Sequence, residues 1–376
     1  MTHTVDSPAS EHSGLSRRDI LKYSLGLAAA GAASGALPRI GLAQGAQING
    51  LMVGPLVAGP LRDILEKGAG AKVNEGNFLS STDNIAKLLA PGGTSRHDIM
   101  MGVSEFSRAP ILGPKSGDEK VKAYNMALVP NFKDLSPNVT DDVVNRDSKV
   151  WLIPIDWGYD SVLYNKDVVP ENDPVTQSWG LQFSEKYAGR IAWFDVPHQM
   201  LMTAGLHLGH KAPETADAKD LDEFGRFLIS KKKLVRTMYT SFAQAVNLMS
   251  SGEVVVMYGW IPHREALQKQ GRNITNNWPS EGLLVWSHGA FIPKDAPNAD
   301  AAMRLVNTML TGEYGAALSR ETGYLGATTT AEALLSADEK KKYGYDVRQR
   351  GIKTYGLKYP TDLNRWVEVW NKVKSA

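Results

Sequence analysis

The chain of 376 residues contains no cysteine. This absence excludes disulfide bonds, thiolate metal ligands and cysteine nucleophiles together. The chain also has no large excess of charge of either sign. It contains 42 lysines and arginines and 40 aspartates and glutamates, which gives a formal net charge of +2. The lysines at residues 231–233 are not interleaved with aromatics and are typical of a solvated helix end. We therefore expect no nucleic-acid partner.

Motifs of catalysis and cofactor binding are missing as well. No Gly-x-Gly-x-x-Gly follows the first predicted strand, which argues against a dinucleotide cofactor. The chain also has no Gly-x-Ser-x-Gly nucleophile elbow and no His-Glu-x-x-His zinc motif. We therefore expect no cofactor and no enzymatic activity, with a secreted hydrolase kept as an alternative.

Residues 1–43 differ in character from the rest of the chain. Arg17 and Arg18 precede an alanine- and glycine-rich stretch that Pro38 interrupts, and Ala43 offers a cleavage site. The stretch is too mildly hydrophobic for a membrane anchor, so the pattern predicts a twin-arginine export signal, the alternative being a structural helix. Without a lipid-bearing cysteine, we expect the exported protein to be a free periplasmic monomer that has passed through the twin-arginine export machinery.

Short apolar runs alternate with helical patterns after the export signal, which is typical of an α/β protein with a mainly parallel sheet. Residues 46–105 read as β-α-β-α-β, with helices that start at Pro60 and at a cap on Ser81 or Thr82. Long strand patterns at residues 151–165 and 285–293 predict two crossings between lobes. We expect lobe 1 at residues 46–153 plus about 288–330, and lobe 2 at residues 154–287 plus about 331–376.

Five motifs recur in an order and spacing that we recognise, and they extend over nearly all of residues 46–376. They are Pro154 with residues 156–159 (DWGY), residues 187–190 (YAGR) before a strand and an acidic turn, residues 251–254 (SGEV) before a strand ending in Gly259-Trp260, the strand from Trp286 with residues 292–298 (IPKDAPN), and Gly323-Tyr324. Their order resembles the periplasmic solute-binding proteins of ABC importers, in the branch with the spermidine/putrescine-binding and γ-aminobutyrate-binding proteins. No single motif establishes this resemblance, which rests on the order and spacing of all five.

The resemblance implies a type II periplasmic binding protein, with a ligand cleft between two α/β lobes and a membrane permease as partner. In this family Trp157, Trp260 and Trp286 occupy positions that line the cleft, and Phe106 and Tyr159 lie close enough in sequence to join them. Aromatic rings offer apolar area and a negative face for a cationic group. The alternative for each of them is packing in a core.

The departures from the family pattern concern charge. Polyamine binders hold their ammonium groups with carboxylates, one of which lies where this chain has His288, and two others where it has Val196 and Gln199. A register error of one residue restores Asp195 as one of them. His198 lies beside Gln199 and adds a donor. We therefore expect too little negative charge for a polyamine, which stays the alternative ligand.

His263 and Arg264 follow shortly after Trp260, and both are candidates for binding a carboxylate. Arg264 matches, to within one residue, the arginine that grips the carboxylate in γ-aminobutyrate-type binders, and a guanidinium suits that task. His263 precedes Arg264 in the sequence. The alternative role of His263 is that of a structural hydrogen-bonding residue, and the alternative for Arg264 is a surface salt bridge. A metal bound by His198, His263 and His288 is a further alternative, although their spacing fits no metal motif. We predict a receptor for a small anionic or zwitterionic solute, and no metal.

Overall fold

The structure of the chain is a computed structural model, and it describes residues 46–76, 78–358, 360 and 362–376. Gly45–Ala376 forms one compact unit. The predicted export signal at residues 1–43 lies outside the described residues. None of the described helices has the length and apolarity needed to cross a membrane.

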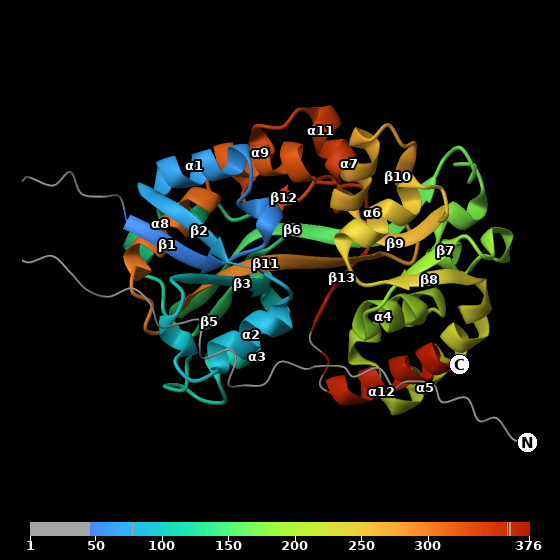
Figure 1. The fold of residues 1–376 in the computed structure, drawn as a ribbon, viewed down its shortest axis with the longest axis horizontal. Helices are drawn as coiled ribbons and strands as arrows, with labels where there is room; N and C mark the ends of the chain where they lie inside the picture. Colours follow the sequence, from blue (N-terminus) through green and yellow to red (C-terminus); the bar gives the residue numbers. More distant parts are fainter. Residues whose placement is uncertain (1–45, 77, 359, 361) are drawn as a thin grey trace, which may run out of the picture. The chain divides into compact units, whose positions relative to one another are not determined.

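Strands and helices alternate along the described chain (Figure 1). The strands are β1 (Ala46–Leu51), β2 (Ala71–Gly76), β3 (Ile99–Val103), β4 (Val121–Lys122), β5 (Val144–Arg146), β6 (Lys149–Asn165), β7 (Ile191–Phe194), β8 (Val235–Tyr239), β9 (Val256–Trp260), β10 (Ile274–Asn276), β11 (Leu283–Pro293), β12 (Leu325–Gly326) and β13 (Thr354–Gly356). The helices are α1 (Pro60–Ala69), α2 (Ser81–Leu89), α3 (Ser104–Leu112), α4 (Pro197–His207), α5 (Ala218–Lys231), α6 (Phe242–Ser250), α7 (Ile261–Lys269), α8 (Ala299–Met309), α9 (Gly312–Thr322), α10 (Thr329–Ala333), α11 (Ala337–Tyr343) and α12 (Leu363–Ser375).

Local sequence signals set the ends of these helices. Pro60 opens α1, and Gly70 closes it with a positive φ of 63°, a conformation that glycine adopts without strain. The side chain of Ser80 caps α2 by accepting a hydrogen bond from the amide of Asp83, so the cap lies one residue before the predicted Ser81. Pro197 opens α4 in the same way as Pro60 opens α1.

The sheet has two parallel parts joined by antiparallel strands. Its order is β2-β1-β3-β11-β6-β9-β7-β8, with β1 parallel to β2 and β3, and β7 parallel to β8 and β9. Between them, β11 and β6 pair antiparallel to each other and to their outer neighbours β3 and β9. Figure 1 shows β6 and β11 running across the middle of this sheet. The prediction of an α/β fold with a mainly parallel sheet in each half is therefore confirmed.

Two large apolar cores flank the crossing strands. One contains Ile153 and Ile155 of β6 and is covered by α1, α8 and α9; the other contains Val162 and Tyr164 of β6 and is covered by α4, α5 and α12. Trp260 is packed against both cores, as is Trp286. The junction between the cores is thus the place where both tryptophans lie. The bounds given above for the two lobes stay a prediction.

Two histidines are enclosed within the fold without charge. His263 is fully buried and stacks on Phe242 with ring centroids 4.4 Å apart, and neither of its ring nitrogens has a hydrogen-bond partner among the described residues. Burial lowers the pKa of His263 from 6.5 to about 3, and it does the same for the pKa of His198. Both side chains are therefore neutral imidazoles in the folded protein near neutral pH.

We predict that acid destabilises the fold through these histidines. Below pH 6.5 the unfolded chain binds protons at both residues and the folded chain does not until about pH 3, so the free energy of unfolding falls as pH falls through this window. Each histidine should contribute about 1.4 kcal/mol per pH unit. Urea unfolding at several pH values measures the slope, and His263→Phe should reduce it by one histidine's share. An unchanged slope in this variant would contradict the prediction.

Candidate functional site

A cavity of about 160 Å³ opens at the junction between the two cores. Three of its lining residues end strands, namely Val103 in β3, Phe194 in β7 and Trp260 in β9. The carboxyl ends of the parallel strands from both halves of the sheet therefore meet here, which is where α/β proteins place their ligands. The complete lining is Val103, Asp160, Phe194, Gln199, Trp260, Trp286, His288, Tyr324 and Leu357.

Aromatic rings form most of the cavity wall. Trp286 and Tyr324 meet edge to face with centroids 5.8 Å apart, and Phe194 and Trp260 do so at 5.5 Å. Trp286 is fixed by a hydrogen bond from its Nε1 to Oδ1 of Asp160, 2.8 Å long. Such walls offer stacking area for an apolar body and π faces for a cation.

Asp160 is the acidic group of the cavity, and only 2% of its surface is exposed. Besides the bond from Trp286, its Oδ2 accepts a hydrogen bond of 2.5 Å from the hydroxyl of Tyr258. Burial raises the pKa of Asp160 to about 7, although both hydrogen bonds act to lower it. The side chain can therefore be an acid or a carboxylate near neutral pH.

Two further polar side chains, His288 and Gln199, face the same space. The ring Nδ1 of His288 lies 2.9 Å from Oδ2 of the fully buried Asp156, whose Oδ1 also accepts the backbone N–H of His288. A bulge in the β6–β11 register follows His288. Because Nδ1 is engaged, Nε2 is the ring nitrogen that can meet a solute. Oε1 of Gln199 is buried without a hydrogen-bond partner among the described residues.

Four of the ten residues predicted for the site line this cavity: Gln199, Trp260, Trp286 and His288. The other aromatic candidates lie elsewhere. Trp157 is buried against Tyr345, Tyr159 donates a hydrogen bond from its hydroxyl to the carbonyl of Tyr343, and Phe106 packs edge to face on His198. His198 and His263 are buried among aromatic rings. None of these six, Arg264 included, is a lining residue.

Arg264 lies in a buried ion pair and not at the cavity. Its Nη2 is 2.9 Å from Oε1 of Glu265 and donates a hydrogen bond of 2.8 Å to the carbonyl of Lys342, while Nη1 donates to Asn276. Asp195 is also engaged away from the cavity, since its Oδ1 accepts a hydrogen bond from Nε1 of Trp370 in α12. The spacing of the sequence motifs predicted that Arg264 and Asp195 lie near the site. In the fold both side chains bind other partners, and neither lines the cavity.

The main residues that sequence reasoning missed are Asp160 and Tyr324. Asp160 lies in a strand that is buried along most of its length, opposite Trp260 in the β6–β9 register. A carboxylate in so apolar a run is unusual, and that was a usable signal. Tyr324 was part of a recognised motif without a role assigned to it.

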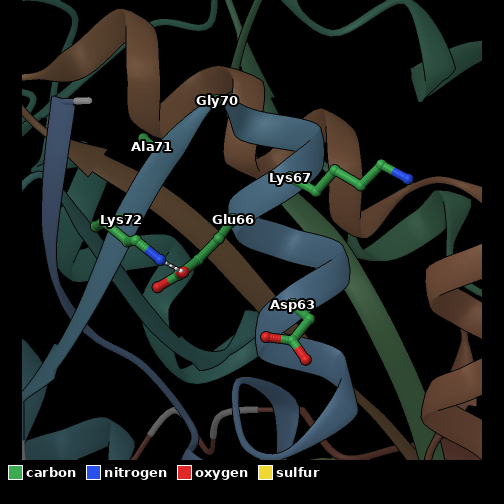
Figure 2. Close-up of a pocket in the computed structure, with 6 residues that line it drawn as sticks. All are labelled: Asp63, Glu66, Lys67, Gly70, Ala71 and Lys72. Atoms are coloured by element: carbon green, nitrogen blue, oxygen red, sulfur yellow. Dashed lines mark hydrogen bonds and ion pairs between the residues drawn. The ribbon is translucent and has the colours of Figure 1, made fainter. Parts of the chain in front are cut away.

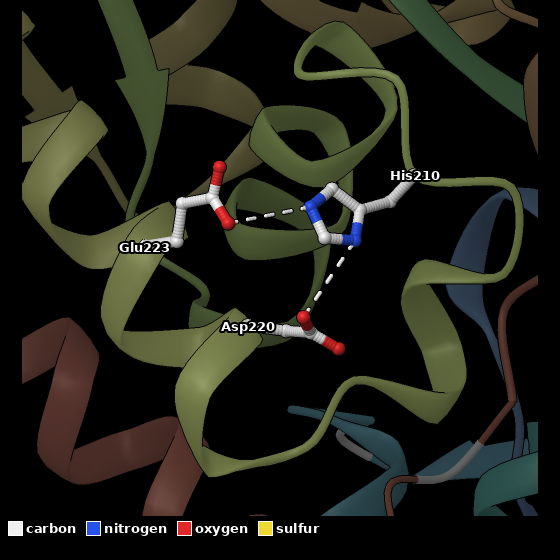
Figure 3. A group of neighbouring side chains, drawn as sticks. All are labelled: His210, Asp220 and Glu223. Atoms are coloured by element: carbon white, nitrogen blue, oxygen red, sulfur yellow. Dashed lines mark ion pairs between the residues drawn. The ribbon is translucent and has the colours of Figure 1, made fainter.

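Two other groups of polar side chains have structural explanations. A recess of about 420 Å³ lies beside α1 and β2, and none of its lining residues is aromatic. Lys72 and Glu66 form an ion pair of 2.6 Å there (Figure 2). His210 lies between two carboxylates (Figure 3). Its Nδ1 is 3.9 Å from Asp220 and its Nε2 is 3.6 Å from Glu223. Each ring nitrogen of His210 thus faces a carboxylate of its own, an arrangement that suits a network of polar contacts at the surface.

Comparison with known proteins agrees with this architecture. Residues 61–344 match the family model described as bacterial extracellular solute-binding protein. The chain is 27% identical to the putrescine-binding periplasmic protein PotF of Escherichia coli strain K12, over 83% of this chain and 86% of that protein.

Two solved structures share the two-lobed fold. The spermidine/putrescine ABC transporter substrate-binding protein PotD from Streptococcus pneumoniae has a TM-score of 0.73 and 19% identity, over 88% of this chain and 99% of that one. The binding protein MotA from A. tumefaciens B6, in complex with glucopine, has a TM-score of 0.66 and 19% identity, over 88% and 100%. The recognised resemblance and the predicted two-lobed fold are therefore confirmed.

We predict that Arg264→Met destabilises the protein. Removing the guanidinium leaves Glu265 buried with Lys342, at 2.6 Å, as its remaining cation, so the loss should be about 3 kcal/mol, the low end for a broken buried pair. Urea unfolding measures it, with Lys269→Met on the exposed side of the same helix as the control. Unchanged stability together with lost solute binding would instead place Arg264 in the binding site.

Proposed function

Because the chain belongs to the bacterial extracellular solute-binding proteins, we propose that it is the periplasmic receptor of an ABC importer and that it captures a small zwitterionic solute. Its partners are then the solute and an inner-membrane ABC permease, to which the loaded receptor delivers its cargo. The family membership supports binding and transport rather than catalysis. The cavity between the two cores is the proposed binding site.

One observation carries the proposal of a zwitterion: the cavity combines a carboxyl group with an imidazole and an amide. Asp160 offers an acceptor for an ammonium group, while Nε2 of His288 and the amide of Gln199 offer polar partners for the other end. Among the described residues, none of those lining the cavity is a lysine or arginine. A purely anionic solute would therefore lack a lysine or arginine partner, which favours the zwitterionic form of the predicted ligand.

The volume of the cavity limits the solute. At about 160 Å³ it is smaller than the pockets of roughly 300–1,000 Å³ that hold drug-sized ligands. A short chain with an ammonium group at one end and a carboxylate at the other fits this limit, and its methylene groups would lie against Trp260 and Trp286.

A diamine is the second candidate, and Asp160 is the observation that favours it. The similar Escherichia coli protein is named as putrescine-binding, and a carboxylate in the cavity suits one ammonium group. The second ammonium group would lie near His288. The neighbouring carboxylate, Asp156, already interacts with the ring of His288. One end of a diamine would thus be desolvated without an opposite charge of its own.

A panel of solutes separates these candidates. γ-Aminobutyrate and other short amino acids should raise the melting temperature and bind in calorimetry, since a ligand that binds only the folded state stabilises it. Putrescine, spermidine and simple carboxylates should bind more weakly. Micromolar or tighter binding of spermidine would overturn the zwitterion proposal, and turnover of a bound solute would overturn the receptor.

We predict that Trp260→Leu lowers the affinity for the solute of this panel that binds best. Loss of stacking and of a π face costs about 1–2 kcal/mol, or roughly tenfold in the dissociation constant. Trp278→Leu is the matched control, because Trp278 lies under the guanidinium of Arg350 and outside the cavity lining. Equal affinities of the Trp260 variant and the wild type in calorimetry would remove Trp260 from the site.

The export route is part of the proposal and has its own test. Replacing Arg17 and Arg18 together by lysine should abolish export of the full chain, because the twin-arginine pair is what the export machinery reads. Cell fractionation measures the fraction of the protein that reaches the periplasm. Lys22→Gln, which leaves the pair intact, is the control. Undiminished export of the double variant would argue for another route.

A further inference from the structure

Among the residues that the structure describes, no lysine, arginine or histidine forms an ion pair with Asp160. The groups that face it are the hydroxyl of Tyr258 from β9 and the indole N–H of Trp286 from β11, and both are neutral donors. Behind Tyr258 lies Tyr239 of β8, whose hydroxyl donates to the carbonyl of Tyr258. Across the cavity are the phenol of Tyr324 and the His288–Asp156 pair.

A buried carboxylate with two neutral donors and no cation is costly to keep ionised. Charges that leave water are normally paired, and an unpaired acid takes up a proton instead. Burial accordingly raises the pKa of Asp160 to about 7. This carboxyl group lines the cavity in which we propose that the solute binds. The ammonium group of the solute would therefore supply the cation that the described part of the protein does not place beside Asp160.

We propose that Asp160 exchanges its proton for the ammonium group of the solute, and that this exchange makes Asp160 the residue that selects solutes with a cationic end. The inference rests on the proposed function of the cavity. In the exchange, the O–H bond of the protonated Asp160 breaks, its proton passes to water or buffer, and the resulting carboxylate pairs with the ammonium group. Nothing is oxidised or reduced, and the charge of the site stays balanced.

The exchange has a direct consequence for affinity. Above about pH 7 the empty receptor already holds a carboxylate, and below it every captured ammonium group must displace a proton. The dissociation constant should therefore be constant at alkaline pH and rise tenfold per pH unit in acid. Between pH 8 and pH 5 this amounts to roughly 100-fold. A neutral solute of the same shape would gain nothing from the carboxylate.

The central experiment is calorimetry with γ-aminobutyrate in buffers that differ in ionisation enthalpy. The protons released per solute should approach one at about pH 6, be about one half at pH 7, and vanish above about pH 8.5. Asp160→Asn should abolish the release and weaken binding by at least tenfold, because the amide carries no proton to exchange and no charge. Unaltered proton release in this variant would overturn the proposal.

Asp142→Asn is the matched control. Burial also raises the pKa of Asp142, to about 6, but this residue does not line the cavity. Its replacement should leave the proton release with γ-aminobutyrate as in the wild type. A loss of release in this variant would assign the proton to Asp142 and overturn the role of Asp160.

Tyr258→Phe tests the mechanism without removing the carboxyl group. Losing the 2.5 Å hydrogen bond removes a donor that favours the ionised form, so the pH at which affinity begins to fall should move upward. A purely structural role of Asp160 would change the affinity at all pH values without moving this midpoint. An unmoved midpoint would therefore count against the exchange.

A measurement on the empty receptor separates failure of this inference from failure of the proposed function. With carbon-13 in the aspartate carboxyl groups, the NMR signal that disappears in Asp160→Asn should titrate near pH 7 in the solute-free protein. Titration near pH 4 would overturn the exchange whatever the ligand is. If instead Asp160 titrates near pH 7 and no solute of the panel binds, the proposed ligand class is wrong, and the exchange with an ammonium group fails with it.

Discussion

The antiparallel pairing of β6 with β11 is the constraint on which the rest of the structure depends. Two parallel half-sheets, each with its own apolar core, would be separate domains without strands that belong to both. β6 places Ile155 in one core and Val162 in the other, and β11 also contributes to both cores, with Ala290 and Leu284. The cavity lies along this seam because the carboxyl ends of the parallel strands meet the crossing there.

The same crossing explains why charged groups are found so deep in the protein. Asp156 and Asp160 lie four residues apart on β6, and each is buried. Asp156 accepts hydrogen bonds within the protein from the ring and the backbone N–H of His288. Asp160 receives only neutral donors from Tyr258 and Trp286. Of these two residues, Asp160 is the one that lines the cavity, and we propose it as the partner of a cationic group.

Recognition of the motifs predicted the fold, and two of the tryptophans in those motifs, Trp260 and Trp286, line the cavity. It did not place Arg264, which spacing brings within one residue of a ligand-binding position. Its guanidinium contacts Glu265, the next residue of α7, and Asn276 of β10, and only the second contact depends on the tertiary packing of α7 against β10. Trp157 and Tyr159 likewise flank the site in sequence but pack into the core beside it. A strand alternates its side chains between two faces, and sequence proximity alone does not say which face is the cavity.

The amino-acid sequence by itself determined the alternation of strands and helices, the absence of thiol chemistry and the two crossing strands, since these follow from local patterns of apolar residues, turns and composition. Only the tertiary structure decided which polar groups line the cavity. Asp160, Gln199 and His288 come from β6, α4 and β11, so their meeting depends on how distant segments pack. The charge state of Asp160 is a tertiary property for the same reason: it depends on burial and on the neighbours that the fold supplies or withholds.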